Sequence, residues 1–306
     1  MRFHGDFSRN YPDDPIGKTG IGAHAHRVPG DVVFLSGPPF LTRQDADYVS
    51  SVAGGKPLLY LHVEEPNYFF VKDWRLFPHE AFHRVYTLCP YTAEWLNEML
   101  ATRLRVPAFF PIDRRHEPPR QNKRYDVVYA GSMIRGWISD TISELKRYRH
   151  AIISHDRSPL ATHRGVSYAE KLALIAQAKV SLIHNLLFLS ERHLAQVRSQ
   201  PGYEKNHAFT RLEERIAPQL KSRLFEAALC RSLILCRHDP WNLVEQHFEP
   251  DRDFLYFRSN REMHDRIGDV SQHFERYEGM IESAYRKVVA HRTPEAFLDL
   301  VVRPSL

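Results

Sequence analysis

The chain has 306 residues, a length that suits two domains of about 100 to 200 residues each. Hydrophobic residues make up 43% and charged residues 26%, as in soluble globular proteins, and no run of about 18 apolar residues offers a membrane span. The formal charge of +5 suits an anionic ligand or acceptor, but it is too mild to indicate nucleic-acid binding by itself.

The start of the chain and its cysteines indicate a cytoplasmic protein. The first residues, MRFHGDFSRNYPDD, are too polar for a secretory signal. Cys89, Cys230 and Cys236 have neither a metal-binding nor a disulfide spacing, and each lies in an apolar stretch. We therefore expect three buried, reduced thiols.

A glycine-rich stretch follows the first predicted strand, MRFHGDF. Gly17, Gly20 and Gly22 would let the backbone approach an anion or a substrate closely, and a flexible surface loop is the alternative. A nucleoside triphosphate P-loop is excluded because Pro12 stands at its first glycine position. The spacing also fails the dinucleotide fingerprint, which argues against a nicotinamide-dependent oxidoreductase.

Two strands are predicted next, from Asp31 (DVVFLSGPP) and from Leu58 (LLYLHVEEP). The second run turns polar at His62, Glu64 and Glu65. Ligands collect beyond the carboxyl ends of strands in open α/β sheets, so these side chains are candidates for a general base, with Glu64 the first choice. A loop start with solvated acids is the structural alternative.

Strands and helices continue to alternate up to residue 112, which predicts a parallel, Rossmann-like first half. Residues 113–124 (DRRHEPPRQNKR) are charged and lack apolar periodicity, so they form the clearest linker. A second α/β unit follows. Residues 187–217 interrupt it with polar, basic helical sequence, and an insertion of this length could fold over a site as a lid.

The second unit begins with the strand YDVVYA, which leads into Gly131 and Ser132, with Arg135 close by. A helix is predicted from about residue 168 to residue 177. The strand after it, VSLIHN, ends at His184 and Asn185, where polar side chains can reach a ligand. A polar residue whose hydrogen bonds are satisfied within the fold is the structural alternative for each.

The segment from Gln219 to Cys236, QLKSRLFEAALCRSLILC, predicts a helix, a tight turn and a buried strand. Lys221 and Arg223 lie in the first turn of that helix, where unpaired N–H groups and the helix dipole already favour an anion. Glu226 follows on the same face, and its carboxylate suits a ribose diol. Together they indicate a nucleoside diphosphate, whereas a surface helix with an ordinary Arg/Glu pair is the alternative.

The same segment resembles a known family. KSRLFEAALCRSLIL, followed by DPWNLVEQHFEPDRDFLYF, is similar to the donor-binding segment of GT-B glycosyltransferases, in the family 1/family 4-like group that includes the spore-maturation-type transferases. The resemblance implies an α/β fold with two Rossmann-like parallel-sheet domains that face a cleft. Residues 1–115 would form the acceptor side and residues 116–285 the nucleotide-sugar domain, and a C-terminal helix, 286–306, would return to the first domain.

The resemblance also implies roles for individual residues. In that family the glutamate at position 226 binds the donor ribose, and the basic residues before it bind the pyrophosphate. The donor residues implied are Gly131, Ser132, Arg135, His184, Asn185, Lys221, Arg223 and Glu226, and the glycine loop that faces the cleft contains Gly20 and Gly22.

Two positions depart from the family pattern. Arg231 stands where the family has glycine after the helix, so we expect the usual left-handed C-cap to be missing. Pro218 stands at the first glutamate of the Glu-x7-Glu pattern, which leaves only Glu226.

The function implied is transfer of a sugar from a nucleoside diphosphate sugar, such as a UDP-sugar, to an acceptor hydroxyl. Lys221 and Arg223 would stabilise the negative charge that develops on the leaving diphosphate. Glu64, or else His62 or Glu65, would deprotonate the acceptor.

No cofactor or metal is expected. Asp45-Ala-Asp47 and Asp251-Arg-Asp253 match the Asp-x-Asp pattern of metal-dependent GT-A transferases. The first lies on a predicted polar helix and the second in a loop, whereas a metal site of that class needs a strand end.

The acceptor stays open among a glycan, a small molecule and modified DNA. A DNA-directed glycosyltransferase or a DNA-binding protein is the alternative function, and it would use the basic segments at 113–124 and 192–215. Peripheral contact with a membrane is also compatible with the charge.

Overall fold

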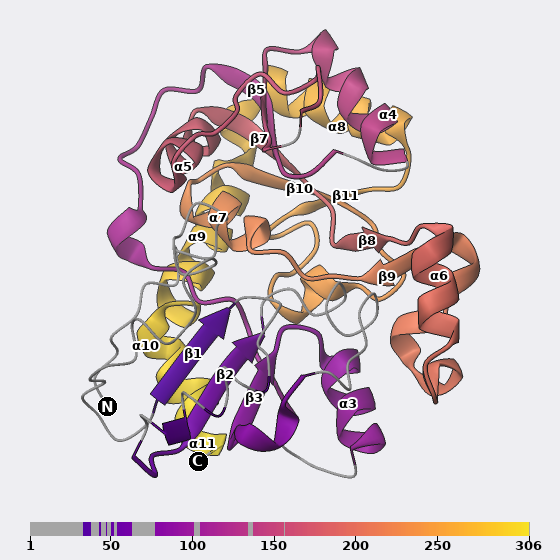
Figure 1. Cartoon of the computed structure of the whole chain (residues 1–306). Helices are drawn as coiled ribbons and strands as arrows, with labels where there is room; N and C mark the ends of the chain where they lie inside the picture. The colour runs from indigo at the N-terminus through magenta and orange to yellow at the C-terminus, as the bar shows by residue number, and fades with distance from the viewer. Residues whose placement is uncertain are drawn as a thin grey trace. The chain divides into compact units, whose positions relative to one another are not determined.

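The structure is a computed structural model, and it describes residues 33–37, 43, 47, 50–51, 54–62, 77–100, 105–133, 137–155 and 157–305. The chain divides into two compact units, and each contains a parallel sheet (Figure 1). Unit 1 comprises residues 1–111, 189–219 and 294–306, and unit 2 comprises residues 112–188 and 220–293. Within the described ranges, no helix is both long and apolar enough to cross a membrane.

The described residues of unit 1 form a four-stranded parallel sheet in the order β1-β2-β3-β4. Its strands are β1 (Val33–Gly37), β2 (Leu58–His62), β3 (Arg84–Thr87) and β4 (Arg105–Pro107). Every residue of β2 is buried, as expected for a parallel strand covered on both faces. Among its described residues this unit contains α3 (Pro90–Met99), α6 (Glu191–Arg198), α10 (Pro294–Phe297) and α11 (Arg303–Ser305), and the short strand β9 spans Ile216–Pro218.

Segments distant in sequence supply part of the core of unit 1. Phe209, from the segment 189–219, meets the ring of Trp95 on α3 edge-to-face at 5.9 Å. Phe297 of α10 is fully buried between Tyr86 and Phe109, whose ring centroids lie 5.6 and 5.5 Å from its own. Residues 189–219 therefore group with unit 1, whereas the sequence assigned them to the second domain.

Unit 2 is a doubly wound α/β unit. Its five parallel strands lie in the order β11-β10-β7-β5-β6. They are β5 (Tyr125–Ala130), β6 (His150–Ile153), β7 (Ala178–Ile183), β10 (Leu233–Arg237) and β11 (Leu255–Phe257), and a short strand β8 (Leu186–Phe188) follows β7. The chain passes from β5 outward to β6 and then returns to the other side of β5 as β7. Ligands bind to sheets of this kind beyond the carboxyl ends of the two strands where the order reverses.

Helices cover both faces of the sheet of unit 2 (Figure 1). One face packs on α4 (Trp137–Ser143), α8 (Asn260–Gln272) and α9 (Glu278–His291). The other packs on α5 (Tyr168–Ala176) and on the end of α7 (Arg223–Leu229). With both faces covered, the strands must be apolar on both sides, and this is why they read as continuous apolar runs in the sequence.

The local sequence explains where these helices begin. The predicted helix 168–177 is confirmed as α5, which starts in a capping box: the Ser167 hydroxyl accepts the Glu170 N–H, and the Glu170 carboxylate accepts the Ser167 N–H. The predicted donor helix starts later than expected. α7 begins at Arg223, so Lys221 lies in the turn that precedes the helix.

α7 ends in a left-handed cap, so the expectation that Arg231 abolishes this cap was wrong. Arg231 adopts a φ of +50°. Its N–H donates to the carbonyl of Ala228 at 3.1 Å, and the Ser232 N–H donates to the carbonyl of Ala227 at 3.0 Å. These are the two hydrogen bonds of the Schellman motif, in which glycine usually occupies the left-handed position.

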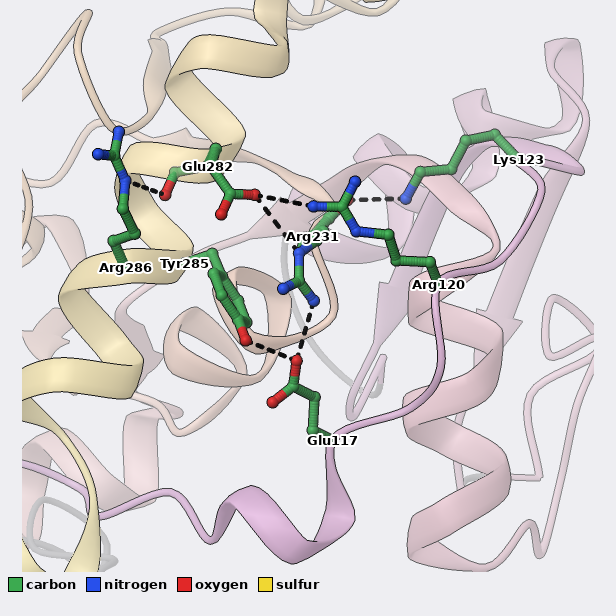
Figure 2. A network of polar contacts seen from close by, with 7 residues as sticks. All are labelled: Glu117, Arg120, Lys123, Arg231, Glu282, Tyr285 and Arg286. Carbon is green, nitrogen blue, oxygen red and sulfur yellow. Dashed lines mark hydrogen bonds and ion pairs between the residues drawn. The ribbon is translucent and has the colours of Figure 1, made fainter.

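The side chain of Arg231 stabilises this conformation (Figure 2). Its Nη1 donates to Glu117 at 2.9 Å, its Nε lies 3.4 Å from a carboxylate oxygen of Glu282, and its guanidinium stacks on Tyr285, with Cζ 3.4 Å from the ring centroid. Lys123 donates to the Arg231 carbonyl at 2.7 Å. A left-handed non-glycine residue costs roughly 1–2 kcal/mol, and a hydrogen bond between charged groups contributes about 1.5–3 kcal/mol, so these contacts offset the strain.

Two substitutions of Arg231 separate the free-energy cost of its left-handed backbone from the stabilisation by its side-chain contacts. Arg231→Gly removes the contacts and the strain together, whereas Arg231→Ala removes the contacts but keeps the strain. We expect the free energy of unfolding to fall in the order wild type, Arg231→Gly, Arg231→Ala, with the last two about 1–2 kcal/mol apart. Urea denaturation measures the order, and equal stability of the two variants would contradict it.

The pH dependence of the free energy of unfolding provides a second test of the contact between Arg231 and Glu117. Burial alone would raise the pKa of Glu117, but hydrogen bonds from Tyr285 and Arg231 and the positive charge nearby outweigh it, and the pKa is lowered. A carboxyl group with a lowered pKa in the folded state stabilises the protein above its ordinary pKa, and this stabilisation is lost as the pH falls. The advantage of the wild type over Arg231→Gly should therefore shrink on acidification below the ordinary pKa of glutamate.

Candidate anion-binding site

Several of the predicted donor residues meet at the carboxyl edge of the sheet in unit 2. Gly131 follows β5 directly, and His184 and Asn185 follow β7. α7 precedes β10 and runs antiparallel to the strands, so the first turn of α7 lies at the same edge. Because β5 and β7 are the two strands where the order reverses, these residues lie where a doubly wound sheet binds its ligand.

Gly131 makes room for Arg223. A Cβ atom at Gly131 would lie 2.8 Å from Cζ of Arg223 and 2.9 Å from the hydroxyl of Tyr129, which is closer than real Cβ atoms approach. The Gly131 N–H donates to the carbonyl of Ile153 at 2.9 Å. Glycine is required at this position because a side chain would collide with Arg223 and Tyr129. Within the described part of the chain, Arg223 forms no ion pair, so its charge has no carboxylate to neutralise it.

Lys221 is fixed by the two polar residues at the end of β7. Its backbone N–H donates to Oδ1 of Asn185 at 3.2 Å, and its Nζ lies 3.1 Å from Nδ1 of His184 and 3.2 Å from the carbonyl oxygen of Leu186. His184 and Asn185 are both buried, with 7% and 0% of their surface exposed. The ammonium is therefore held at the carboxyl edge by buried, uncharged groups.

His184 is neutral in this environment. Burial, together with the positive charges of Lys221, Arg223 and Arg237, holds the pKa of the imidazole well below its ordinary range. On its other side, Nε2 of His184 lies 3.1 Å from the hydroxyl of Tyr129. Tyr129 was not predicted as a site residue, because in the pattern YDVVYA it is an ordinary strand residue.

Glu226 lies in a different environment from the one predicted by the helical spacing. Its side chain is 1% exposed and forms an ion pair with Lys171 of α5, whose Nζ lies 2.8–2.9 Å from both carboxylate oxygens. Burial lowers the pKa of Lys171, and the charge of Glu226 opposes that shift. No local pattern predicts this pair, because its members are 55 residues apart.

The catalytic candidates fall in unit 1. His62 is the last residue of β2 and is fully buried, with its ring 5.8 Å from the ring of Tyr60 and 6.0 Å from that of Phe77. Seven further candidates lie outside the described residues: Gly17, Gly20, Gly22, Asp45, Glu64, Glu65 and Arg135.

The second Asp-x-Asp pair has a structural role in unit 2. The Asp253 carboxylate is fully buried, accepts hydrogen bonds from the Glu249 N–H at 2.7 Å and the Ser283 hydroxyl at 2.6 Å, and pairs with Lys287. Asp251 adopts a left-handed backbone conformation in the turn.

Gly131→Ala tests the close approach of Arg223. The added methyl group must displace either the guanidinium or the Tyr129 hydroxyl, which donates to the Ser132 carbonyl at 2.7 Å. The flexible arginine moves more easily, so we expect a loss of about tenfold in affinity for a diphosphate, equivalent to about 1.4 kcal/mol. Titration calorimetry with pyrophosphate measures it. Gly165→Ala, where the new methyl group would meet nothing within 4 Å, is the control for a glycine in the left-handed region.

A doubly wound parallel sheet with cationic side chains at its reversal point is typical of enzymes and binding proteins whose ligands carry phosphate. The chain belongs to the glycosyl transferase-like family, whose family model matches residues 116–302. A search of curated proteins finds no match.

Solved structures of GT-B glycosyltransferases share the fold. The pneumococcal O-GlcNAc transferase GtfA, in complex with UDP and GlcNAc, is 13% identical with a TM-score of 0.54, over 85% of this chain and 54% of that one. TarM is 9% identical with a TM-score of 0.55, over 90% and 54%. Anabaena HepE, in complex with UDP and glucose, is 12% identical with a TM-score of 0.54, over 96% and 84%. This chain therefore spans about half the length of GtfA and TarM.

Proposed function

We propose that this protein is a metal-independent glycosyltransferase that transfers a sugar from a nucleoside diphosphate sugar to an acceptor hydroxyl. The observation that carries the proposal is the pair of cations, Lys221 and Arg223, at the reversal point of the unit 2 sheet, with Gly131 leaving space beside Arg223. Membership of the glycosyl transferase-like family supports it. UDP is the first nucleotide to test because GtfA and HepE were both solved with UDP.

In the proposed reaction the two cations act on the leaving group. As the bond between the sugar and the diphosphate breaks, negative charge accumulates on the diphosphate, and fixed positive charges stabilise it more than they stabilise the intact donor. A side chain of unit 1, with Glu64 the first choice and His62 or Glu65 next, would remove the proton of the acceptor hydroxyl.

Calorimetric titration of the full chain with UDP, uridine and pyrophosphate tests the donor site. We expect UDP to bind at least about tenfold more tightly than uridine, because a hydrogen bond to a charged group contributes about 1.5–3 kcal/mol. The affinity should be unchanged by EDTA if no metal is required. UDP-glucose and UDP-GlcNAc should then be cleaved to UDP, slowly with water and faster with the right acceptor.

Lys146→Met is the matched control for Lys221→Met. Lys146 is exposed on the 3₁₀ turn Glu144–Arg147 that precedes β6, at the opposite edge of the same sheet, so both variants lose one positive charge. Only Lys221→Met should weaken UDP binding. A chain that binds no nucleoside diphosphate, or that loses affinity equally in both variants, would refute the proposed donor site.

A further inference from the structure

Two adjacent side chains at the end of β7 hold the same lysine. Asn185 accepts the backbone N–H of Lys221, and His184 faces its ammonium group through Nδ1. Asn185 also lies against the sulfur of Cys236 on β10, with Nδ2 3.8 Å from Sγ. Lys221 therefore has both its backbone and its side chain fixed by buried residues of the neighbouring strand end.

The partners of His184 assign its tautomer. The hydroxyl of Tyr129 donates its single proton to the Ser132 carbonyl at 2.7 Å, so toward His184 it can only accept. Nε2 of His184 must therefore carry a hydrogen, and Nδ1 is left as an acceptor. Lys221 can only donate, and its ammonium lies at Nδ1. The neutral imidazole with hydrogen on Nε2 thus suits both Tyr129 and Lys221, whereas an imidazolium would place an N–H at Nδ1 against the ammonium.

We propose that His184 and Asn185 are positioning residues that hold Lys221 at the diphosphate site, and that His184 acts as a neutral acceptor and does not bind the ligand as a cation. The inference rests on the proposed function. It differs from the direct donor contact that the sequence suggested for these two residues. The cations that face His184 from α7, from the turn before α7 and from β10 are Arg223, Lys221 and Arg237, and they favour the neutral ring.

Two conservative variants of His184 separate these roles. The amide of Asn can reproduce the acceptor at Nδ1, which faces Lys221, and the longer Gln reaches the position of Nε2, which faces Tyr129. We expect His184→Asn to bind UDP within about threefold of the wild type, and His184→Gln to lose about tenfold, the size of one charge-assisted hydrogen bond. Calorimetry with UDP is the measurement, and both variants retain a polar side chain at this buried position.

A double-mutant cycle then shows whether His184 acts through Lys221. If it does, His184→Gln should change UDP affinity by less than about twofold when Lys221→Met is already present. An equal loss of UDP affinity from His184→Gln in the wild type and in Lys221→Met would overturn the proposal. Equal UDP affinities of His184→Asn and His184→Gln would also overturn it. The ratio of the wild-type and His184→Asn affinities should also stay constant from pH 8 to pH 5.5. A ratio that favours the wild type increasingly on acidification would identify His184 as a cationic ligand.

The cycle distinguishes this inference from the proposed function. A wild-type chain that fails to bind UDP refutes the donor site itself. A wild-type chain whose UDP binding depends on Lys221 but not on His184 leaves the donor site in place and refutes the positioning role alone.

Discussion

Replacing Glu226 by alanine is expected to lower the free energy of unfolding by about 3–5 kcal/mol, the typical cost of removing one partner of a buried ion pair. The side chains of Lys171 and Glu226 are only 9% and 1% exposed, so the ammonium left behind would be buried without its counter-charge. The loss should exceed that of any other single substitution considered for this chain.

Denaturation with urea, at a pH where Lys171 is charged, measures the effect. Glu226→Gln keeps an acceptor of the same shape and should cost less than Glu226→Ala. The double variant Lys171→Met/Glu226→Leu removes both charges and should recover most of the stability, because well-packed apolar residues often replace a buried ion pair without loss. A Glu226→Ala protein as stable as the wild type would show that the ion pair is absent in solution.

This expectation changes how a ribose contact by Glu226 must be tested. A loss of UDP affinity in Glu226→Ala would be ambiguous, because the same substitution disturbs the packing of α5 against α7. Glu226→Gln with uridine as the ligand is the better probe. It retains the side-chain volume while it removes the charge that would accept hydrogen bonds from the ribose diol.

Replacing Arg223 by methionine should weaken UDP binding by about tenfold to a hundredfold, the range of one hydrogen bond between charged groups. Among the described residues no ion pair involves Arg223, and its guanidinium lies at Gly131, beside the carboxyl end of β5. Turnover should fall further, because interactions with charge that develops in the transition state contribute about 10² to 10³ in rate.

Arg276→Met is the matched control for this variant. Arg276 is exposed on the 3₁₀ turn Phe274–Tyr277 beyond the end of α8, away from the carboxyl edge, so the two variants have the same net charge. The UDP affinity measured by calorimetry and the rate of UDP release from the donor should both fall only in Arg223→Met. If Arg276→Met lost as much UDP affinity as Arg223→Met, the effect would come from the net charge of the protein and not from a defined site.

The sequence predicted the elements whose signals are local. α5 was predicted within one residue because the pattern that marks it is local to its own segment of the chain. The strand ends at Gly131 and His184 were predicted because continuous apolar runs stop there. These positions also located the candidate site, since the carboxyl ends of parallel strands lie at one edge of a sheet.

Contacts between distant parts of the chain could not be predicted in the same way. Lys171 lies on α5 and Glu226 on α7, and nothing in either helix specifies the other. Tyr129 and His184 are likewise 55 residues apart, and their hydrogen bond depends on the pairing of β5 with β7. Arg231 was misjudged for a related reason, because its local preference is against a left-handed cap and its stabilising partners come from Glu117 and α9.

The cap at Arg231 also constrains the order in which such a chain can change. An arginine that replaces glycine at this turn is costly by itself, and it becomes favourable only when Glu117, Glu282 and Tyr285 are already in place. An exchange of glycine for arginine at this turn would therefore keep its stability only in a chain that already has the acidic and aromatic partners. Once Arg231 is present, losing Glu117 is no longer neutral. Relatives that keep the glycine should accordingly vary freely at the three partner positions, whereas relatives with arginine should not.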